Sequence, residues 1–193
     1  MVALKCFSKN DQNFSIQVQT LFRADNVLEV IFFLRAPQES MNWLSFLQIS
    51  EGQLGEQVLG LLKQKNELWK SHCFEFFFTF DPLKEPYFEV NFSPQGHWAF
   101  YSFEKYRQRG EDSLRPPQLK TKIVYIEKFG LDIHLELDVS LFLPSKQEIH
   151  VAPAAILNFP HGNEFWALEH SSQQPDFHNF KSKSMRLSKS QGA

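Results

Sequence analysis

Two phenylalanine-rich runs constrain the fold of this chain more than any other part of its sequence. They are "LWKSHCFEFFFTF" (68–80) and "YFEVNFSPQGHWAFYSF" (87–103). Apolar residues recur at every second position in both runs, which is the period of a β-strand, and proline and glycine punctuate the runs where turns are expected. The pattern predicts three consecutive antiparallel strands at about 73–80, 86–93 and 97–104.

The remaining chain adds further strands of similar length. A hairpin is expected in "FSIQVQTLFRADNVLEVIFFLRA" (14–36), where Asp25-Asn26 supplies the tight turn. Two strands are expected within residues 121–143 and two more within 152–170, followed by an edge strand near Met185. Because no strand–helix–strand alternation is present, we predict an all-β antiparallel β-sandwich of the jelly-roll or immunoglobulin-like type.

One helix and one loop complete the predicted architecture. Leu54, Val58, Leu61 and Leu62 recur at helical spacing, which predicts a short surface helix over 51–65. Residues 107–120 are polar and contain two prolines, so we expect an exposed loop there. The domain is expected to span 1–180, with a polar basic tail at 181–193.

Composition excludes several classes of function. The net charge is −2 and the pI about 6.4, so the chain as a whole lacks the cationic surface that nucleic acids or anionic membranes require. The sequence contains no apolar segment long enough to span a membrane and no apolar signal core near the N-terminus. Cys6 and Cys73 are too few for a disulfide framework. We therefore expect a soluble cytoplasmic protein with two free thiols, which has no nucleic-acid or membrane partner and leaves a protein partner open.

Polar residues lie on the face of the predicted sheet opposite the phenylalanines. Because side chains alternate along a strand, Phe74, Phe76, Phe78 and Phe80 face the core together. Glu75, Glu89 and Asn91 then share the opposite face with Phe77 and Tyr87. An apolar surface carrying a few convergent polar groups is typical of a site that stacks a sugar ring and hydrogen-bonds its hydroxyls.

These pieces resemble the DOMON-like proteins related to the family 9 carbohydrate-binding modules. The shared pattern is a tryptophan, an acidic residue at the start of a phenylalanine-rich strand, and a "Y-x-E-F-N-x-S-P-x-G" hairpin; "YFEVNFSPQG" and "FWALEHSSQQPDFH" carry it here. The resemblance is close over about 68–107 and 160–180. It implies a β-sandwich that binds a sugar non-enzymatically between two tryptophans, without a cofactor.

The resemblance assigns the candidate ligand-binding residues one by one. It implies that Trp69 and Trp166 form the two walls of the clamp, and that Glu75, Asn91 and Asn163 bind hydroxyl groups. Glu89 departs from the family pattern, in which a basic residue tends to occupy that position. Two additions come from position in the chain: Arg107, which could supply the missing cation, and His170, which has the same strand parity as Trp166. Trp98 and Tyr101 fall on opposite faces of one strand, and we expect Trp98 in the core.

Three alternatives to sugar binding remain open at this point. The Glu75–Glu89 pair could serve as the acid and nucleophile of a glycoside hydrolase. Two carboxylates so close together should also either raise the pKa of one of them or bind a cation such as calcium. Some DOMON relatives bind haem, for which Met41 and Met185 are possible ligands. His161, His170, Asp176 and His178 form a loose cluster whose spacing matches no zinc pattern, so we expect surface or hydrogen-bonded histidines there.

Overall fold

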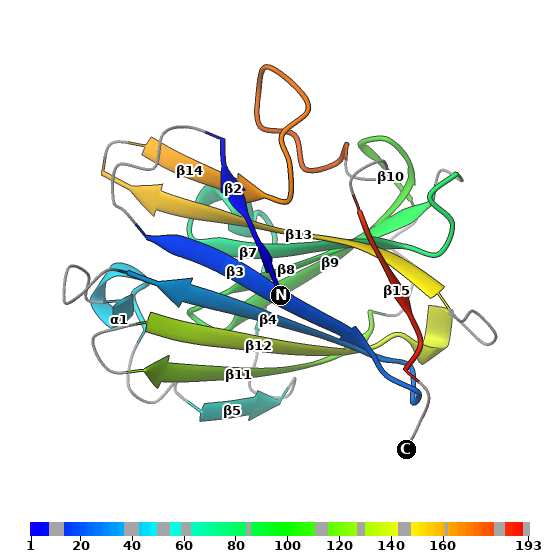
Figure 1. Ribbon diagram of the computed structural model, residues 1–193, viewed down its shortest axis with the longest axis horizontal. Helices are drawn as coiled ribbons and strands as arrows, with labels where there is room; N and C mark the ends of the chain where they lie inside the picture. Colours follow the sequence, from blue (N-terminus) through cyan, green and yellow to red (C-terminus); the bar gives the residue numbers. More distant parts are fainter. Residues whose placement is uncertain are drawn as a thin grey trace.

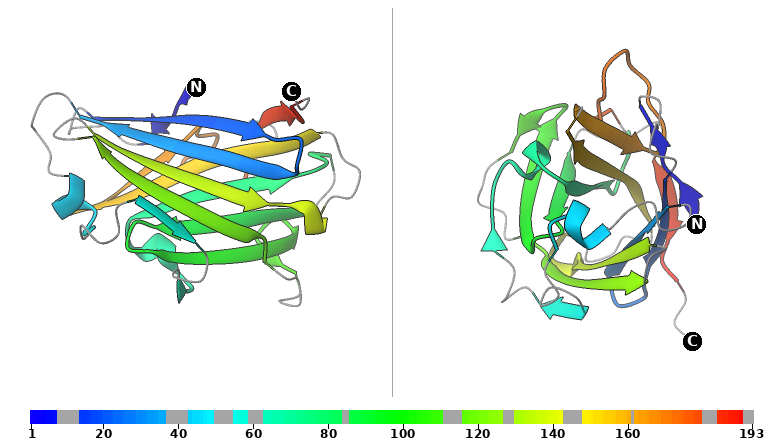
Figure 2. Two further views of the ribbon diagram at one scale, coloured as in Figure 1. Left: turned by 90° about the horizontal axis from the view of Figure 1, so that it is seen from below. Right: turned by 90° about the vertical axis from the view of Figure 1, so that its left-hand side faces the viewer.

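Two β-sheets pack face to face in the computed structural model (Figures 1 and 2). The structure describes residues 1–7, 14–36, 43–49, 55–58, 63–83, 86–110, 116–126, 130–142, 148–160, 162–179 and 184–190. Within these ranges the strands pair antiparallel, except for one short parallel pair. The predicted antiparallel β-sandwich is confirmed.

The first sheet has six strands. Their order is β1 (Val2–Ala3), β3 (Ser15–Phe22), β4 (Val27–Arg35), β12 (Gly130–Asp138), β11 (Gln118–Ile126) and β5 (Gly55–Val58). The expected hairpin joins β3 and β4, and Asn26 in its turn has a φ of 66°, a left-handed conformation that asparagine tolerates.

The second sheet has nine strands and carries the two phenylalanine-rich runs. Its order is β10 (Gln108–Arg109), β9 (His97–Lys105), β8 (Tyr87–Ser93), β7 (Cys73–Thr79), β13 (Glu148–Phe159), β14 (Gly162–Ala167) and β2 (Lys5–Cys6), while β15 (Met185–Ser188) pairs with β13 and β6 (Lys63–Gln64) with β9. The predicted strands at 73–80, 86–93 and 97–104 and the edge strand near Met185 are confirmed.

The helical elements are short. They are α1 (Trp43–Phe46) and the 3₁₀ turns η3 (Leu68–Lys70) and η4 (Ser140–Phe142). None of the helices in the described ranges has the length and apolar character needed to cross a bilayer.

The helix predicted over 51–65 is wrong in its described part. Gly55–Val58 forms β5, which pairs with β11, and Lys63–Gln64 forms β6 beside β9. The leucine spacing indicated a helix, but Gly55 weakens helical propensity and strand β11 offers an unpaired edge to this segment. The expected loop over 107–120 is also interrupted by strand structure, because β10 begins at Gln108 and β11 at Gln118.

The main core lies between the two sheets and is built from the alternation seen in the sequence. Phe74, Phe76 and Phe78 of β7 point into it, and the ring of Phe74 lies 5.1 Å from that of Phe32 on the facing sheet. Trp98 is also in this core, as expected. Burial of these aromatic side chains removes large apolar surfaces from water, which favours folding.

The nine-stranded sheet is also buried on its outer face. Every residue of β7 is buried, and a second apolar cluster including Phe77, Tyr87 and Tyr101 covers this face. Trp69 of η3 and Phe177, in the segment that follows β14, pack against the cluster. This segment, residues 168–179, rises as a loop beside the sheet in Figure 1. The polar residues of the outer face therefore lie under a partial cover rather than in open solvent.

Candidate functional site

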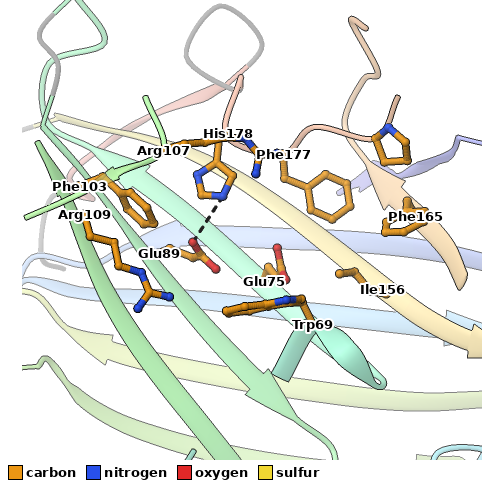
Figure 3. A pocket seen from close by; sticks show the side chains of 11 residues that line it. Trp69, Glu75, Glu89, Phe103, Arg107, Arg109, Ile156, Phe165, Phe177 and His178 are labelled. Atoms are coloured by element: carbon orange, nitrogen blue, oxygen red, sulfur yellow. Dashed lines mark ion pairs between the residues drawn. The ribbon is translucent and has the colours of Figure 1, made fainter. Parts of the chain in front are cut away.

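A pocket of about 350 Å³ opens on the outer face of the nine-stranded sheet. This volume is within the range of sites that hold small ligands. The pocket is lined by side chains from η3, from six strands of the sheet and from the segments around them: Trp69, Glu75, Glu89, Phe103, Arg107, Arg109, Ile156, Phe165, Pro175, Phe177 and His178 (Figure 3).

Two buried carboxyl groups form the acidic part of this pocket. In the pairing of β7 with β8, Glu75 lies opposite Asn91 and Phe77 lies opposite Glu89. The two glutamates therefore come from adjacent strands and point to the same face, and each is only 4% exposed. The strand alternation read from the sequence placed these side chains correctly.

Burial shifts the proton affinity of both carboxyls upward. It raises the pKa of Glu75 well above its usual range, and the nearby charge of Glu89 adds to the effect. Burial also raises the pKa of Glu89 to about 7, against the opposing influence of a hydrogen bond from Asn91. Burial therefore favours the neutral form of Glu75, which can donate a hydrogen bond, while Glu89 is partly ionised at neutral pH and can accept one.

The amide of Asn91 supports Glu89 from beneath the pocket. Asn91 Nδ2 donates a 2.7 Å hydrogen bond to Glu89 Oε1. Asn91 is completely buried and does not line the pocket, so the structure places it behind Glu89 rather than at the pocket surface.

Two arginines also line the pocket. Arg107, with a φ of 54°, pairs through Nη2 with Asp176 Oδ1 at 2.9 Å. Arg109 of β10 instead lays its guanidinium over the ring of Tyr101, 4.2 Å from the centroid. Both guanidinium groups favour the ionised form of Glu89 and so hold down its pKa.

His178 is held in the neutral form inside the pocket. Burial and the nearby Arg107 charge lower its pKa to about 4. Its Nδ1 lies 2.8 Å from the hydroxyl of Tyr87, and this hydroxyl also accepts a hydrogen bond from the Arg107 backbone N–H. The other ring nitrogen, Nε2, lies 3.9 Å from Glu89 Oε2.

Trp69 forms the aromatic platform of the site. Its half-buried indole lies 6.1 Å from the ring of Tyr101, between centroids, and borders the same pocket as Glu75 and Glu89 (Figure 3). The structure thus brings together Trp69, Glu75, Glu89 and Arg107 from the residues that the sequence singled out.

Trp166 does not belong to this pocket, and its assignment as the second wall of a clamp is wrong. It is 3% exposed, packs in the main core, and its ring lies 5.0 Å from that of Phe14. Phe165, the preceding residue, lines the pocket instead. Both residues are large and apolar, so the alternation could not decide which one faces outward, and the indole fills the space against a residue far away in the sequence.

Asn163 and His170 also lie away from the pocket. Asn163 is exposed near the β13–β14 turn, where its Oδ1 accepts a 2.6 Å hydrogen bond from Asn158. His170 lies beyond the end of β14, where strand parity no longer applies, and its Nε2 is 2.8 Å from the carbonyl oxygen of Lys5. Neither side chain lines the pocket.

The described residues among the possible metal and haem ligands do not form a metal site. No group of three or more His, Cys, Asp or Glu side chains suited to a metal ion occurs in the described ranges. Met185 lies on β15, where it packs against the main core, and Met41 and His161 fall outside the described residues. Neither Cys6 nor Cys73 forms a disulfide bond in the described part of the chain.

Several pocket residues are not among the ligand-binding residues predicted from the sequence. The most important are Arg109 and His178, joined by Phe103, Ile156, Phe165, Pro175 and Phe177. Arg109 follows Arg107 at the spacing of alternate strand residues, which is the only sequence feature that could have indicated it. His178 lies in a polar segment that runs back across the sheet without regular secondary structure. Its sequence therefore has no strand or helix period from which its position could be predicted.

Comparison with known proteins shows the fold but not a family. No protein-family profile matches the chain, and no curated protein is similar enough to count as a match. Among solved structures, a Bacteroides uniformis protein described as an inferred carbohydrate-binding protein has the same fold, with a TM-score of 0.61 and 11% sequence identity. The match covers 98% of this chain and 85% of the other.

Proposed function

We propose that the pocket binds a carbohydrate or a related small polyol without converting it. The observation that carries the proposal is the meeting of the Trp69 indole with the buried carboxyls of Glu75 and Glu89 in one pocket (Figure 3). An aromatic surface suits the C–H face of a sugar ring, while directional hydrogen-bonding groups beside it suit the hydroxyls.

The protonation of the acidic pair fits this ligand class. A sugar hydroxyl is both a donor and an acceptor, and adjacent hydroxyls need partners of both kinds. A protonated Glu75 donates and an ionised Glu89 accepts. Arg107, which also lines the pocket, adds N–H donors.

The resemblance to DOMON-like modules and the fold of the Bacteroides uniformis protein support the same proposal. The resemblance covers the strands that carry Glu75, Glu89 and Asn91, and the solved structure is that of an inferred carbohydrate-binding protein. In place of a second tryptophan, Phe103, Phe165 and Phe177 supply further aromatic surface in the pocket. The proposed site is therefore a platform with a phenylalanine cover, rather than a sandwich of two indoles.

Calorimetric titration with a panel of mono- and disaccharides tests the proposal. Binding of at least one sugar is expected, and Trp69→Ala should weaken it by about 1–3 kcal/mol, as the loss of an aromatic anchor does. Leu141→Ala is the control, because Leu141 is a large exposed apolar residue of η4 outside the pocket. Equal affinity in the wild type and in Trp69→Ala would exclude this pocket as the sugar site.

Two inexpensive measurements separate the competing functions. Release of reducing sugar from a glycoside panel would indicate that the Glu75–Glu89 pair is catalytic. A Soret absorption band in the purified protein would indicate haem.

A further inference from the structure

The charges around the pocket leave one cation without a partner. Arg107 is matched by Asp176 at 2.9 Å. Arg109 has no carboxylate within ion-pair distance in the described part of the chain, and its guanidinium lies over Tyr101 instead. A guanidinium stacked on an aromatic ring keeps its N–H donors at the edge of the plane, where they remain available to a ligand.

The acidic residues of the pocket do not neutralise this cation fully. Glu75 is buried, and burial raises its pKa well above the usual range, which favours its neutral form. Glu89 titrates near neutrality, with a pKa of about 7, and already accepts a hydrogen bond from Asn91. On the acid side of neutral pH the pocket therefore holds an excess of positive charge, located at Arg109.

The position of Arg109 relative to Trp69 limits where an anionic group could lie. Tyr101 contacts both side chains: the guanidinium carbon of Arg109 is 4.2 Å and the indole of Trp69 is 6.1 Å from its ring centroid. The cation and the indole are thus neighbours in the pocket lining (Figure 3). A ring lying on Trp69 would direct its edge substituents toward Arg109.

We propose that the ligand of this pocket is an acidic sugar, a uronate or a sugar phosphate, whose anionic group pairs with Arg109 while its ring packs on Trp69. Arginine binds carboxylate and phosphate groups through two parallel N–H bonds, which gives this contact both strength and direction. The inference rests on the proposed function and narrows it to one class of sugar.

Matched ligand pairs test the inference by calorimetry at slightly acid pH. The pairs are glucose with glucuronate, galactose with galacturonate, and glucose with glucose 6-phosphate. The acidic member of a pair should bind about tenfold more tightly than the neutral one, and the advantage should shrink at high salt because exposed charges are screened. Preference for a uronate or for the phosphate identifies which anion the site recognises.

Arg109→Gln should remove the advantage of the acidic sugar, so that the acidic and neutral members of a pair bind this variant with affinities within about a factor of two of each other. The control is Arg186→Gln, which deletes the same charge from an exposed arginine of β15 that lies outside the pocket. It should preserve the preference, which separates a direct contact from a change in net charge.

Different results would contradict the acidic-sugar inference alone or the proposed function as well. Equal affinity for acidic and neutral sugars in the wild type would overturn the acidic-sugar inference and leave the proposed function standing. A preference that survives Arg109→Gln would also overturn it. Failure of every sugar to bind would overturn both, and binding of inorganic phosphate as tightly as glucose 6-phosphate would show that the ring on Trp69 plays no part.

Discussion

Asn91 Nδ2 donates a 2.7 Å hydrogen bond to Glu89 Oε1, and both residues are buried on the outer face of the nine-stranded sheet. The other amide atom, Asn91 Oδ1, is buried without a partner among the described residues. Glu75 lies directly opposite Asn91 in the pairing of β7 with β8. The hydrogen bond from Asn91 thus holds Glu89, one of the two carboxyls that form the acidic part of the pocket.

Asn91→Ala should destabilise the protein, and the loss should depend on pH. The hydrogen bond from Asn91 favours ionised Glu89, so its removal costs most where Glu89 is charged, above about pH 7. We expect a loss of about 1–3 kcal/mol in the free energy of unfolding there, and less well below that pH. Urea unfolding at two pH values measures the difference. Asn163→Ala, at an exposed position, should change stability little at either pH.

The buried carboxyls should make the fold less stable as the pH rises. The folded chain keeps protons on Glu75 and Glu89 at pH values where the unfolded chain has released them. The free energy of unfolding therefore falls as the pH rises, from about 4.5 to about 7 for Glu89, and Glu75 adds to the fall because its pKa is also raised. His178 opposes this trend between its ordinary pKa of 6.5 and its lowered value of about 4, where acid favours the unfolded chain, and the lowered pKa values of His72, His97 and His134 act in the same direction. Above pH 6.5 these histidines no longer add to the slope.

Urea unfolding across this range, compared with Glu75→Gln, tests the effect. Above pH 6.5 the wild type should lose up to about 1.4 kcal/mol per pH unit for each carboxyl that is still protonated in the fold. Glu75→Gln should flatten the slope, because glutamine does not titrate. Glu104→Gln, at an exposed position of β9, should leave it unchanged. An unaltered slope in Glu75→Gln would contradict the assignment of a neutral, buried Glu75.

Trp166 and Trp69 should differ sharply in their effects on stability. Because Trp166 fills the core against Phe14, Trp166→Ala should cost about 3–5 kcal/mol, whereas Trp166→Phe should cost less since it keeps an aromatic ring in place. Trp69 lies half-buried at the edge of the outer cluster, so Trp69→Ala should act mainly on ligand binding. Thermal unfolding of the three variants compares them. A milder loss for Trp166→Ala than for Trp69→Ala would contradict the placement of both residues.

Tyr87 should hold the segment 171–179 against the sheet. Its hydroxyl bonds the Arg107 backbone and lies 2.8 Å from His178 Nδ1, so Tyr87→Phe removes both connections at once. Amide hydrogen exchange in 171–179 should become about tenfold faster. Tyr101→Phe is the matched control: its hydroxyl contacts Asn66 and Glu67 instead, so protection of 171–179 should persist. Equal exchange rates in wild type and Tyr87→Phe would contradict this role.

The strands of the pocket could be predicted because their pattern is local. Phe74, Phe76 and Phe78 mark the core face of β7, and this alone places Glu75 on the other side. The same alternation puts Glu89 on the matching face of β8. The carboxyl pair was therefore accessible from the sequence, whereas its burial was not, since that depends on the cover formed by η3 and residues 168–179.

Where the predictions failed, distant contacts outweighed the local pattern. Leu54 to Leu62 have helical spacing, but Gly55–Val58 pairs with the edge of β11, more than sixty residues away in the chain. Phe165 and Trp166 of β14 are both large and apolar. Trp166 is the interior one, where its ring packs against that of Phe14. His178 reaches Glu89 only because the chain returns across the sheet.

A crystal structure with the tightest-binding sugar of the titration panel tests the central claim most directly. The account predicts a sugar ring against the indole of Trp69, with hydroxyls on the carboxyls of Glu75 and Glu89. A sugar bound elsewhere on the protein, with this pocket empty in the same crystal, would contradict it.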